Sequence, residues 1–186
     1  MDDANAQEQP GTPTAAAFIR DARAQTRPGG FAGPRNPGDA WVEGPSGKFW
    51  GKFGSAGLLV FDAGRGVLLQ HRAIWSHHGG TWGLPGGALH EGESAVDGAL
   101  RESWEEAGVP RANVELLFTS VYDVGYWRYT TVAVEAVTSF EAVISDPESL
   151  ALEWVPLSAV AELSLHPGFG AAWPELRRRL VPRRSE

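Results

Sequence analysis

The sequence predicts an α/β domain in which short strands surround two or three helices. Short apolar runs bounded by turn residues recur from residue 56 onward, which is the pattern of strands in a packed sheet. Between them, residues 95–107 repeat apolar side chains at helical spacing. The length of 186 residues and the hydrophobic content of 42% suit one globular domain with a sizeable core.

The strands can be placed from the turns between them. The apolar runs 56–61 and 67–71 flank a link at 62–66 that is rich in Gly and Asp, so they predict a β-hairpin. Three further strands are expected at 114–121, at 128–137 antiparallel to it, and at 151–155.

The helix at 95–107 carries start and stop signals. Ser94 followed three residues later by Asp97 is a capping box, and Gly108 is the residue type that ends a helix. Two more helices are expected at 157–163 and at 171–180, the second interrupted near Pro174.

The N-terminal 40 residues differ from the rest of the chain. They contain no Leu, Val or Trp and five Pro, so they bury too little surface to offset the entropy of ordering them. We therefore expect a mostly disordered arm at 1–40, one domain at 41–181 and a short basic tail at 182–186. The aromatic residues at 49, 50 and 53 indicate either a first strand or an aromatic flap docked on that domain.

Composition excludes several classes of protein. No run approaches the roughly 18 apolar residues of a membrane helix. The polar, acidic start is unlike a signal peptide, and the lack of Cys excludes disulfides and fits a reducing compartment, so a cytoplasmic location is expected. A net charge of -7 argues against a general DNA or RNA binder.

A cluster of carboxylates marks the predicted helix. Glu102, Glu105 and Glu106 are spaced i, i+3, i+4 and project from neighbouring positions, a pattern that on its own is often only a solvated face. Arg101 neutralises part of this charge, and a hard divalent cation with oxygen ligands would neutralise the rest. The Pro-Gly-Gly corner at 85–87 lets a backbone carbonyl approach such an ion.

The spacing of these residues resembles the Nudix box, the signature of a family of Mg2+-dependent pyrophosphohydrolases. The box reads G-x5-E-x7-R-E-U-x-E-E-x-G-U, with U a bulky apolar residue. Here Ser103 departs from one U position, whereas Val109 satisfies the other. The fixed positions are filled by Gly87, Glu93, Arg101, Glu102, Glu105, Glu106 and Gly108. The resemblance extends over about residues 41–173 and is to the MutT-like branch, on the segments 49–51, 70–73 and 166–169.

The resemblance implies an α/β/α sandwich with a mixed sheet that is mainly antiparallel at its edges. It also implies a Mg2+ site at which Mn2+ can substitute. The implied metal ligands are Gly86, Glu102, Glu105, Glu106 and Glu148, the last of them six positions before Trp154. The implied catalytic residues are Glu102, which positions or deprotonates water, the orienting pair Arg101 and Glu93, and Glu105.

Four residues are candidates for binding substrate: Arg72, Trp82, Leu84 and Phe169. Arg72 resembles a phosphate-contacting Arg, although a surface strand end is an equal alternative. Trp82 and Phe169 suit base stacking, although aromatic side chains more often belong to a core. Relatives that favour oxidised guanine carry an aromatic residue at the position of Leu84 and an Asn in the C-terminal loop. This departure leaves selectivity for 8-oxo-guanine open.

The implied activity is hydrolysis of a (deoxy)nucleoside triphosphate, with 8-oxo-dGTP among the candidates, to the monophosphate and pyrophosphate. One alternative substrate is a nucleoside diphosphate linked to another group, such as ADP-ribose. Another alternative is a non-catalytic nucleotide sensor, which usually loses box carboxylates that this chain keeps. The expected partner is the nucleotide, without nucleic acid or membrane, in a monomer or homodimer. Adjacent His77 and His78 lack the partner spacing of a zinc site, so none is predicted there.

Overall fold

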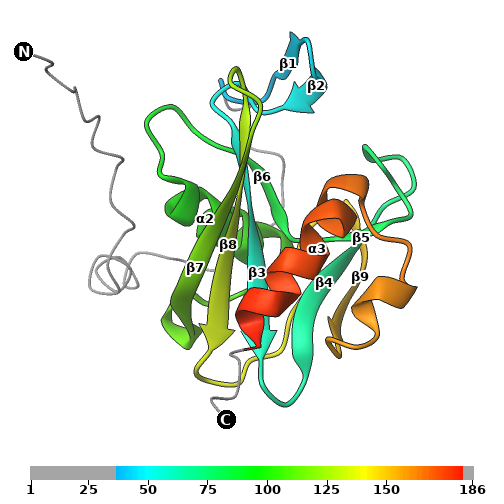
Figure 1. Cartoon of the computed structure of the whole chain (residues 1–186). Coiled ribbons are helices and arrows are strands. Elements are labelled where there is room, and N and C mark those ends of the chain that lie inside the picture. The colour runs from blue at the N-terminus through cyan, green and yellow to red at the C-terminus, as the bar shows by residue number, and fades with distance from the viewer. Residues whose placement is uncertain (1–36, 182–186) are drawn as a thin grey trace, which may run out of the picture.

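The computed structural model describes residues 37–181 (Figure 1). The predicted arm at 1–40, apart from 37–40, and the basic tail at 182–186 lie outside the described residues. The domain limits therefore stay predictions. No helix in the described part of the chain is long and apolar enough to cross a membrane.

A mixed sheet forms the centre of the described region. Its strands are β3 (Ser55–Asp62), β4 (Gly66–Arg72), β5 (Trp82–Gly83), β6 (Gly86–Ala88), β7 (Val114–Asp123), β8 (Arg128–Ala136) and β9 (Ser149–Val155). They pair in the order β5-β4-β3-β8-β7, with β6 added to β3 and β9 to β4. Strands β3 and β8 run parallel, and the other described pairs in this sheet are antiparallel. The predicted hairpins and the mixed sheet are confirmed.

Two helices cover the two faces of the sheet, α2 (Ala95–Ala107) on one and α3 (Pro167–Leu180) on the other (Figure 1). Each face has its own apolar core. Val96, Ala99 and Leu100 of α2 pack in the first, and Trp173 and Leu176 of α3 in the second. This arrangement confirms the expected sandwich.

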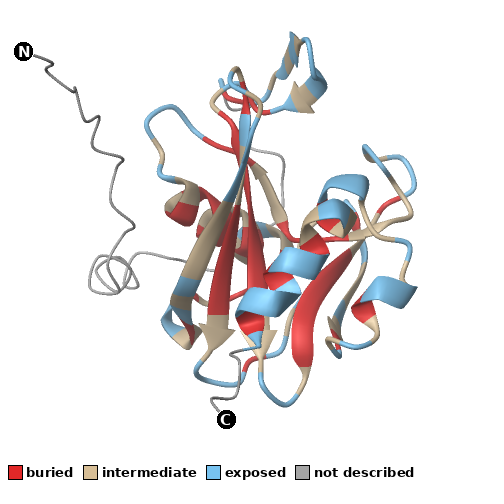
Figure 2. Ribbon diagram, in the orientation of Figure 1, coloured by how far each residue is buried: buried red, intermediate tan, exposed pale blue. Residues whose placement is uncertain are grey.

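The central strands explain why two cores form. In β3, Leu58 and Val60 belong to the core under α2, whereas Leu59 between them belongs to the core under α3. In β8, Val134 belongs to the core under α2, and its neighbour Ala133 belongs to the core under α3. Because successive side chains of a strand point to opposite faces, a continuous apolar run serves both layers. Figure 2 shows the middle of both strands buried.

The box helix begins and ends where the sequence predicts. The Ser94 side chain accepts a hydrogen bond from the backbone N–H of Asp97 at 3.1 Å. Gly108 takes the left-handed conformation with φ of 64°, and its N–H bonds back to the Trp104 carbonyl at 3.0 Å. Both ends of α2 are thus fixed by local interactions.

The C-terminal helices differ from expectation. The predicted helix at 157–163 is wrong: only the 3-10 turn η2 (Val160–Glu162) forms, with i to i+3 hydrogen bonds and Val160 buried against the sheet. Helix α3 begins at Pro167 rather than at 171, because His166 caps it and Pro167 fits the first turn. Pro174 lies inside the continuous helix, whose halves are both anchored in the core.

The N-terminal aromatic residues form a flap. Strands β1 (Trp41–Gly44) and β2 (Gly47–Trp50) pair as a separate hairpin, drawn at the top of Figure 1. Phe49 stacks on Trp127 at 4.3 Å between ring centroids, and Trp127 Nε1 donates to the Trp50 carbonyl at 3.0 Å. Both alternatives are confirmed: Phe49 and Trp50 lie in a strand, β2, and the hairpin packs on the domain as a flap.

The sheet divides along β3, and this division positions the box. One edge of β3 pairs with β4 near Phe61 and with β6 at its opposite end, around Ala56. The Leu58 N–H then bonds to the Pro85 carbonyl at 2.9 Å. Strand β6, and the loop and helix α2 that follow it, therefore begin beside the part of β3 that is not paired with β4, which forms an opening in the sheet.

A 3-10 turn, η1 (Arg111–Asn113), leads from α2 into β7. Arg111 donates to the Asp97 carboxylate at 2.9 Å, so this turn is tied back to the start of the box helix.

Candidate active site

The corner that enters the box is shaped by two glycines. A Cβ at Gly87 would lie 2.7 Å from Cδ of Glu102, so the missing side chain lets this carboxylate lie directly over the backbone. A Cβ at Gly86 would instead meet the backbone carbonyl of Ala56 on the neighbouring strand. The box thus begins with a close approach that only glycine permits.

Arg101 is the centre of the hydrogen-bond network. Its guanidinium donates to both oxygens of Glu93 at 2.9 Å and to Glu102 Oε1 at 2.6 Å. It also donates to the Ala88 carbonyl at 3.0 Å, and Glu105 lies 3.6 Å away. Burial works to lower the pKa of Arg101, but the pairs with Glu93 and Glu102 outweigh it and raise the pKa. The network holds the Glu102 carboxylate in a fixed orientation.

Glu102 has an unusual protonation equilibrium. Burial raises its pKa to about 7, and the charges of Glu105 and Asp39 act in the same direction. The ion pair with Arg101 offsets only part of this effect. Ionised Glu102 is therefore costly in this buried position, even beside Arg101.

Glu106 lies next to the Gly86 backbone. Its Oε2 accepts from the Gly86 N–H at 2.9 Å and from Nε2 of Gln70 at 3.4 Å. Enclosure of the carboxyl and the nearby charge of Glu102 raise its pKa well above the usual range, against a lowering effect of Arg72. An enclosed carboxylate whose ionisation is opposed by a neighbouring carboxylate fits a site for a positive ion.

Gln70 links this carboxylate to the neighbouring strand β9 and is a residue that the sequence reasoning missed. Its side chain is 1% exposed and donates to Ser149 Oγ at 2.8 Å. The available signal was a polar residue inside the apolar run 67–71, because a buried amide requires partners.

The two outer acidic residues are more accessible. Glu105 is about half exposed, and Glu148 lies on the exposed loop before β9. Partial desolvation and the neighbouring Asp146 raise the pKa of Glu148, and Arg72 lowers it. The Ser145 N–H donates to the Glu106 carbonyl at 3.2 Å, so the loop of Glu148 is tied to the end of the box helix.

The oxygen donors in this region fit a hard divalent cation. The predicted ligands are the carboxylates of Glu102, Glu105, Glu106 and Glu148 and the carbonyl of Gly86, which offer oxygen without nitrogen or sulfur. Such donors match the preference of Mg2+ or Mn2+. Burial, and to a smaller extent nearby carboxylates, raise the pKa of Glu102 and Glu106, so a bound cation would favour their ionised forms.

The candidate substrate residues fall into two groups. Arg72, at the end of β4, donates to the His77 carbonyl at 3.2 Å and acts on the pKa of both Glu106 and Glu148. Trp82 stacks on His71, with ring centroids 4.6 Å apart. Both lie beside the opening in the sheet and keep partial exposure.

Leu84 and Phe169 are placed differently. Their exposed fractions are 6% and 7%, and both belong to the core under α3. Phe169 packs on Trp173 at 5.6 Å between ring centroids. They offer little surface to a nucleotide base, and their role in binding stays a prediction.

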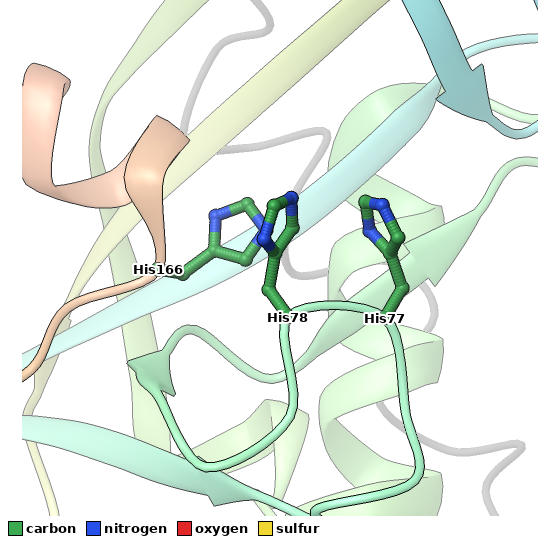
Figure 3. Close-up of side chains that lie close together, drawn as sticks. All are labelled: His77, His78 and His166. Atoms are coloured by element: carbon green, nitrogen blue, oxygen red, sulfur yellow. The ribbon is translucent and has the colours of Figure 1, made fainter.

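A second cluster, outside the box, was also missed. The structure brings His166 next to His77 and His78 (Figure 3). One ring nitrogen from each of the three lies within 4.8 Å of the others. The sequence shows that His77 and His78 are adjacent, but it does not reveal a third metal ligand, because His166 is distant along the chain. Only the fold of the two loops joins them.

The two box glycines give a paired test. Gly87→Ala is expected to keep the fold, because the clashing group is a side-chain carboxylate, and to lower kcat by about 10–100-fold, since Glu102 is displaced. Gly86→Ala is expected to lower the Tm by several degrees, because its clash is with fixed backbone. Thermal unfolding and steady-state kinetics of both variants measure this. Equal behaviour of the two would contradict the assigned geometry.

Comparisons with known proteins agree with this arrangement. A model of the NUDIX domain family matches residues 51–175. The Mycobacterium tuberculosis H37Rv protein named "Putative 8-oxo-dGTP diphosphatase 3" is 47% identical over 154 residues, covering 77% of this chain and 70% of the relative. The 8-oxo-dGTP diphosphatase of Proteus vulgaris is 31% identical over 88 residues, covering 47% of this chain and 78% of the relative.

A solved structure extends the likeness to three dimensions. The crystal structure of RenU, a Nudix hydrolase of M. smegmatis, superposes with a TM-score of 0.70 at 42% identity, covering 80% of this chain and all of that one. The family match spans more than half of the chain and contains every fixed residue of the box. This chain therefore belongs to the Nudix hydrolase family, whose members act on phosphoanhydride bonds.

Proposed function

We propose that the protein is a Mg2+-dependent pyrophosphohydrolase that cleaves (deoxy)nucleoside triphosphates to the monophosphate and pyrophosphate. The observation that carries this proposal is the network in which Arg101 orients Glu93 and Glu102 while Glu106 is held on the Gly86 backbone. A sensor without activity would have no need for this costly arrangement of partly buried charges.

The proposed metal ligands are the Gly86 carbonyl, Glu102, Glu105, Glu106 and Glu148. Mg2+ bound there would neutralise the pyrophosphate and lower the pKa of a bound water, and Mn2+ is proposed to substitute for it. The donor chemistry and the raised pKa of Glu102 and Glu106 support this set.

The protein's own groups then have distinct tasks. Glu102, whose carboxylate is oriented by Arg101, is proposed to accept a proton from the attacking water. Arg101, paired with Glu93, holds the Glu102 carboxylate in place. Glu105, on the exposed side of the helix, lies 3.6 Å from Arg101 and is proposed to add to this orientation. Arg72 is proposed to contact a phosphate, and its position near Glu106 and Glu148 supports this role.

For the base, we propose a permissive pocket beside Trp82. Trp82 is partly exposed and stacks on His71, whereas Leu84 and Phe169 lie beneath in the core. A pocket that works by ring stacking tolerates many bases, whereas one with placed hydrogen bonds rejects the wrong edge strongly. The names of the M. tuberculosis and Proteus relatives favour 8-oxo-dGTP as one substrate.

We also propose that the enzyme acts on its nucleotide alone, as a monomer or homodimer, and binds neither DNA nor RNA. The net charge of -7 supports the latter, because a general nucleic-acid binder needs excess positive charge. The absence of Cys supports a reducing, cytoplasmic location.

The test is a panel of substrates in one Mg2+ buffer: dGTP, 8-oxo-dGTP, dCTP and ADP-ribose. We expect a preference for purine triphosphates, with 8-oxo-dGTP favoured over dGTP by less than about 100-fold in kcat/KM, roughly 2.7 kcal/mol. Activity is expected to vanish with EDTA and to return with Mg2+ or Mn2+.

Two results would change this view. Selectivity far above 100-fold would require placed hydrogen bonds to the oxidised base. Cleavage of ADP-ribose alone would favour the alternative activity on a nucleoside diphosphate linked to another group.

A further inference from the structure

Three imidazoles meet outside the box, between two segments that are far apart in the sequence. His77 and His78 lie on the loop that joins β4 to β5, and His166 lies at the start of α3. The ring centroids of His77 and His78 are 4.0 Å apart, and those of His78 and His166 are 4.7 Å apart. Figure 3 shows the three rings gathered at one place. One ring nitrogen from each histidine lies within 4.8 Å of one from each of the other two.

The loop holds His77 and His78 in defined positions. The Ser76 Oγ donates to the Ala73 carbonyl at 2.8 Å, and the Thr81 Oγ1 donates to the His78 carbonyl at 2.6 Å. His78 is the one described non-glycine residue with a positive φ, at 55°. Such a conformation costs free energy and persists only where the surrounding structure holds it. Backbone strain of this kind is common at functional sites.

His166 is fixed from the other side. Its N–H donates to the Trp82 carbonyl at 2.8 Å, and the Trp82 N–H donates to the Ser164 carbonyl at 2.8 Å. The Nδ1 atom of His166 accepts from the Gly168 N–H at 3.2 Å and caps α3. The start of α3 is therefore registered against β5, next to the loop of His77 and His78.

The charge state of the cluster suits a metal ligand. Burial, the neighbouring imidazoles and Arg72 lower the pKa of His166 to about 4, and burial with the charges of His78 and Arg72 lowers the pKa of His77. The lowered pKa favours the neutral form of His77 and His166, which keeps a lone pair for a cation. Arg72 and the N-terminus of α3 oppose a positive ion here, so they weaken its binding.

We propose that His77, His78 and His166 form a binding site for a transition-metal cation of the Zn2+ class, distinct from the box carboxylates. Three nitrogen donors without a carboxylate match Zn2+, Co2+ or Ni2+ rather than Mg2+. Three protein ligands leave one coordination position open for water or for an anionic oxygen. The bound ion joins the β4–β5 loop to α3.

Binding requires small movements that the cluster permits. Tetrahedral coordination at about 2.0–2.1 Å places ligand nitrogens roughly 3.3 Å apart, so the rings must approach one another from the present spread of up to 4.8 Å. His77 and His78 are exposed, and the ring of His77 also packs edge-on against Trp41 with centroids 5.0 Å apart. If His166 binds through Nε2, its proton moves to Nδ1 and the hydrogen bond from Gly168 is given up.

Zn2+ titration of the full chain by calorimetry tests the site, in a large excess of Mg2+ so that the box is filled. The variants are His78→Asn, which tolerates the left-handed backbone, and His166→Ser, which keeps a capping side chain. We expect one Zn2+ per chain in the wild type and binding weaker by on the order of 100-fold in either variant. The control is His90→Asn, an exposed His outside the cluster, which is expected to bind as the wild type does.

Further measurements separate the sites. Co2+ bound to the wild type is expected to give the intense visible absorption of a tetrahedral site, and His77→Ala is expected to remove it. Unchanged Zn2+ affinity in all cluster variants would overturn the proposal. So would loss of the Zn2+ site in Glu106→Gln, because the ion would then lie in the box. Circular dichroism without metal checks that each variant folds, and the exposed His77 and His78 keep the test valid if His166→Ser unfolds.

Discussion

Glu106→Gln is expected to lower kcat by a factor on the order of 10^3 or more while the protein stays folded. Gln keeps an oxygen that can accept from the Gly86 N–H but removes the charge that would hold Mg2+. Because enclosure and Glu102 raise the pKa of Glu106, ionised Glu106 costs stability in the metal-free protein. The variant should therefore have an unchanged or higher Tm in EDTA.

Steady-state kinetics with dGTP and thermal unfolding in EDTA measure both effects. Glu115→Gln is the matched control, since Glu115 is an exposed residue on β7 outside the box, and its kcat should equal that of the wild type. Near-full turnover in Glu106→Gln would show that the proposed metal ligands are wrong.

Arg101→Ala is expected to reduce both stability and activity. It leaves the carboxylates of Glu93 and Glu102, which are 14% and 17% exposed, without their cation. Breaking a buried pair by removing one partner costs about 3–5 kcal/mol, and partial exposure places this case near the lower end, about 3 kcal/mol. This corresponds to a fall in Tm of roughly 10 °C for a domain of this size. The turnover number should fall as well, since Glu102 loses its orientation.

Two further variants make this result specific. Arg101→Lys restores the charge without the forked geometry, so its stability should lie between wild type and Arg101→Ala. Arg128→Ala removes an ion pair with Asp123 of 2.7 Å that is largely exposed, and surface pairs contribute at most about 1 kcal/mol. If Arg101→Ala were no more destabilising than Arg128→Ala, the network around Arg101 would not stabilise the box.

The sequence by itself determined the parts that depend on local spacing. The box helix is set by its own caps at Ser94 and Gly108, which interact within a few residues. The carboxylates of Glu102 and Glu106 share a helix face because four residues make about one turn. The strands at 55–62 and 128–136 were also predictable, because continuous apolar runs serve a sheet that is covered on both faces.

The start of α3 and the loss of the helix at 157–163 needed more than pattern. The apolar residues of 157–163 are compatible with a helix, but the chain uses a single 3-10 turn because Ser164 must reach the Trp82 N–H. Pro174 predicted an interruption, yet tertiary packing of Trp173 and Leu176 holds the helix together across it.

The tertiary structure alone decided which distant residues share a site. Gln70 reaches Glu106 because β4 separates from β3 at the point where β6 enters. Leu84 and Phe169 lie in the core beneath α3, a packing that their positions in the sequence do not reveal. His166 meets His77 and His78 because hydrogen bonds to Trp82 register the start of α3 against β5. Local spacing fixes neighbours within a few turns of chain, whereas contacts between loops depend on how the whole sheet pairs, which no local pattern records.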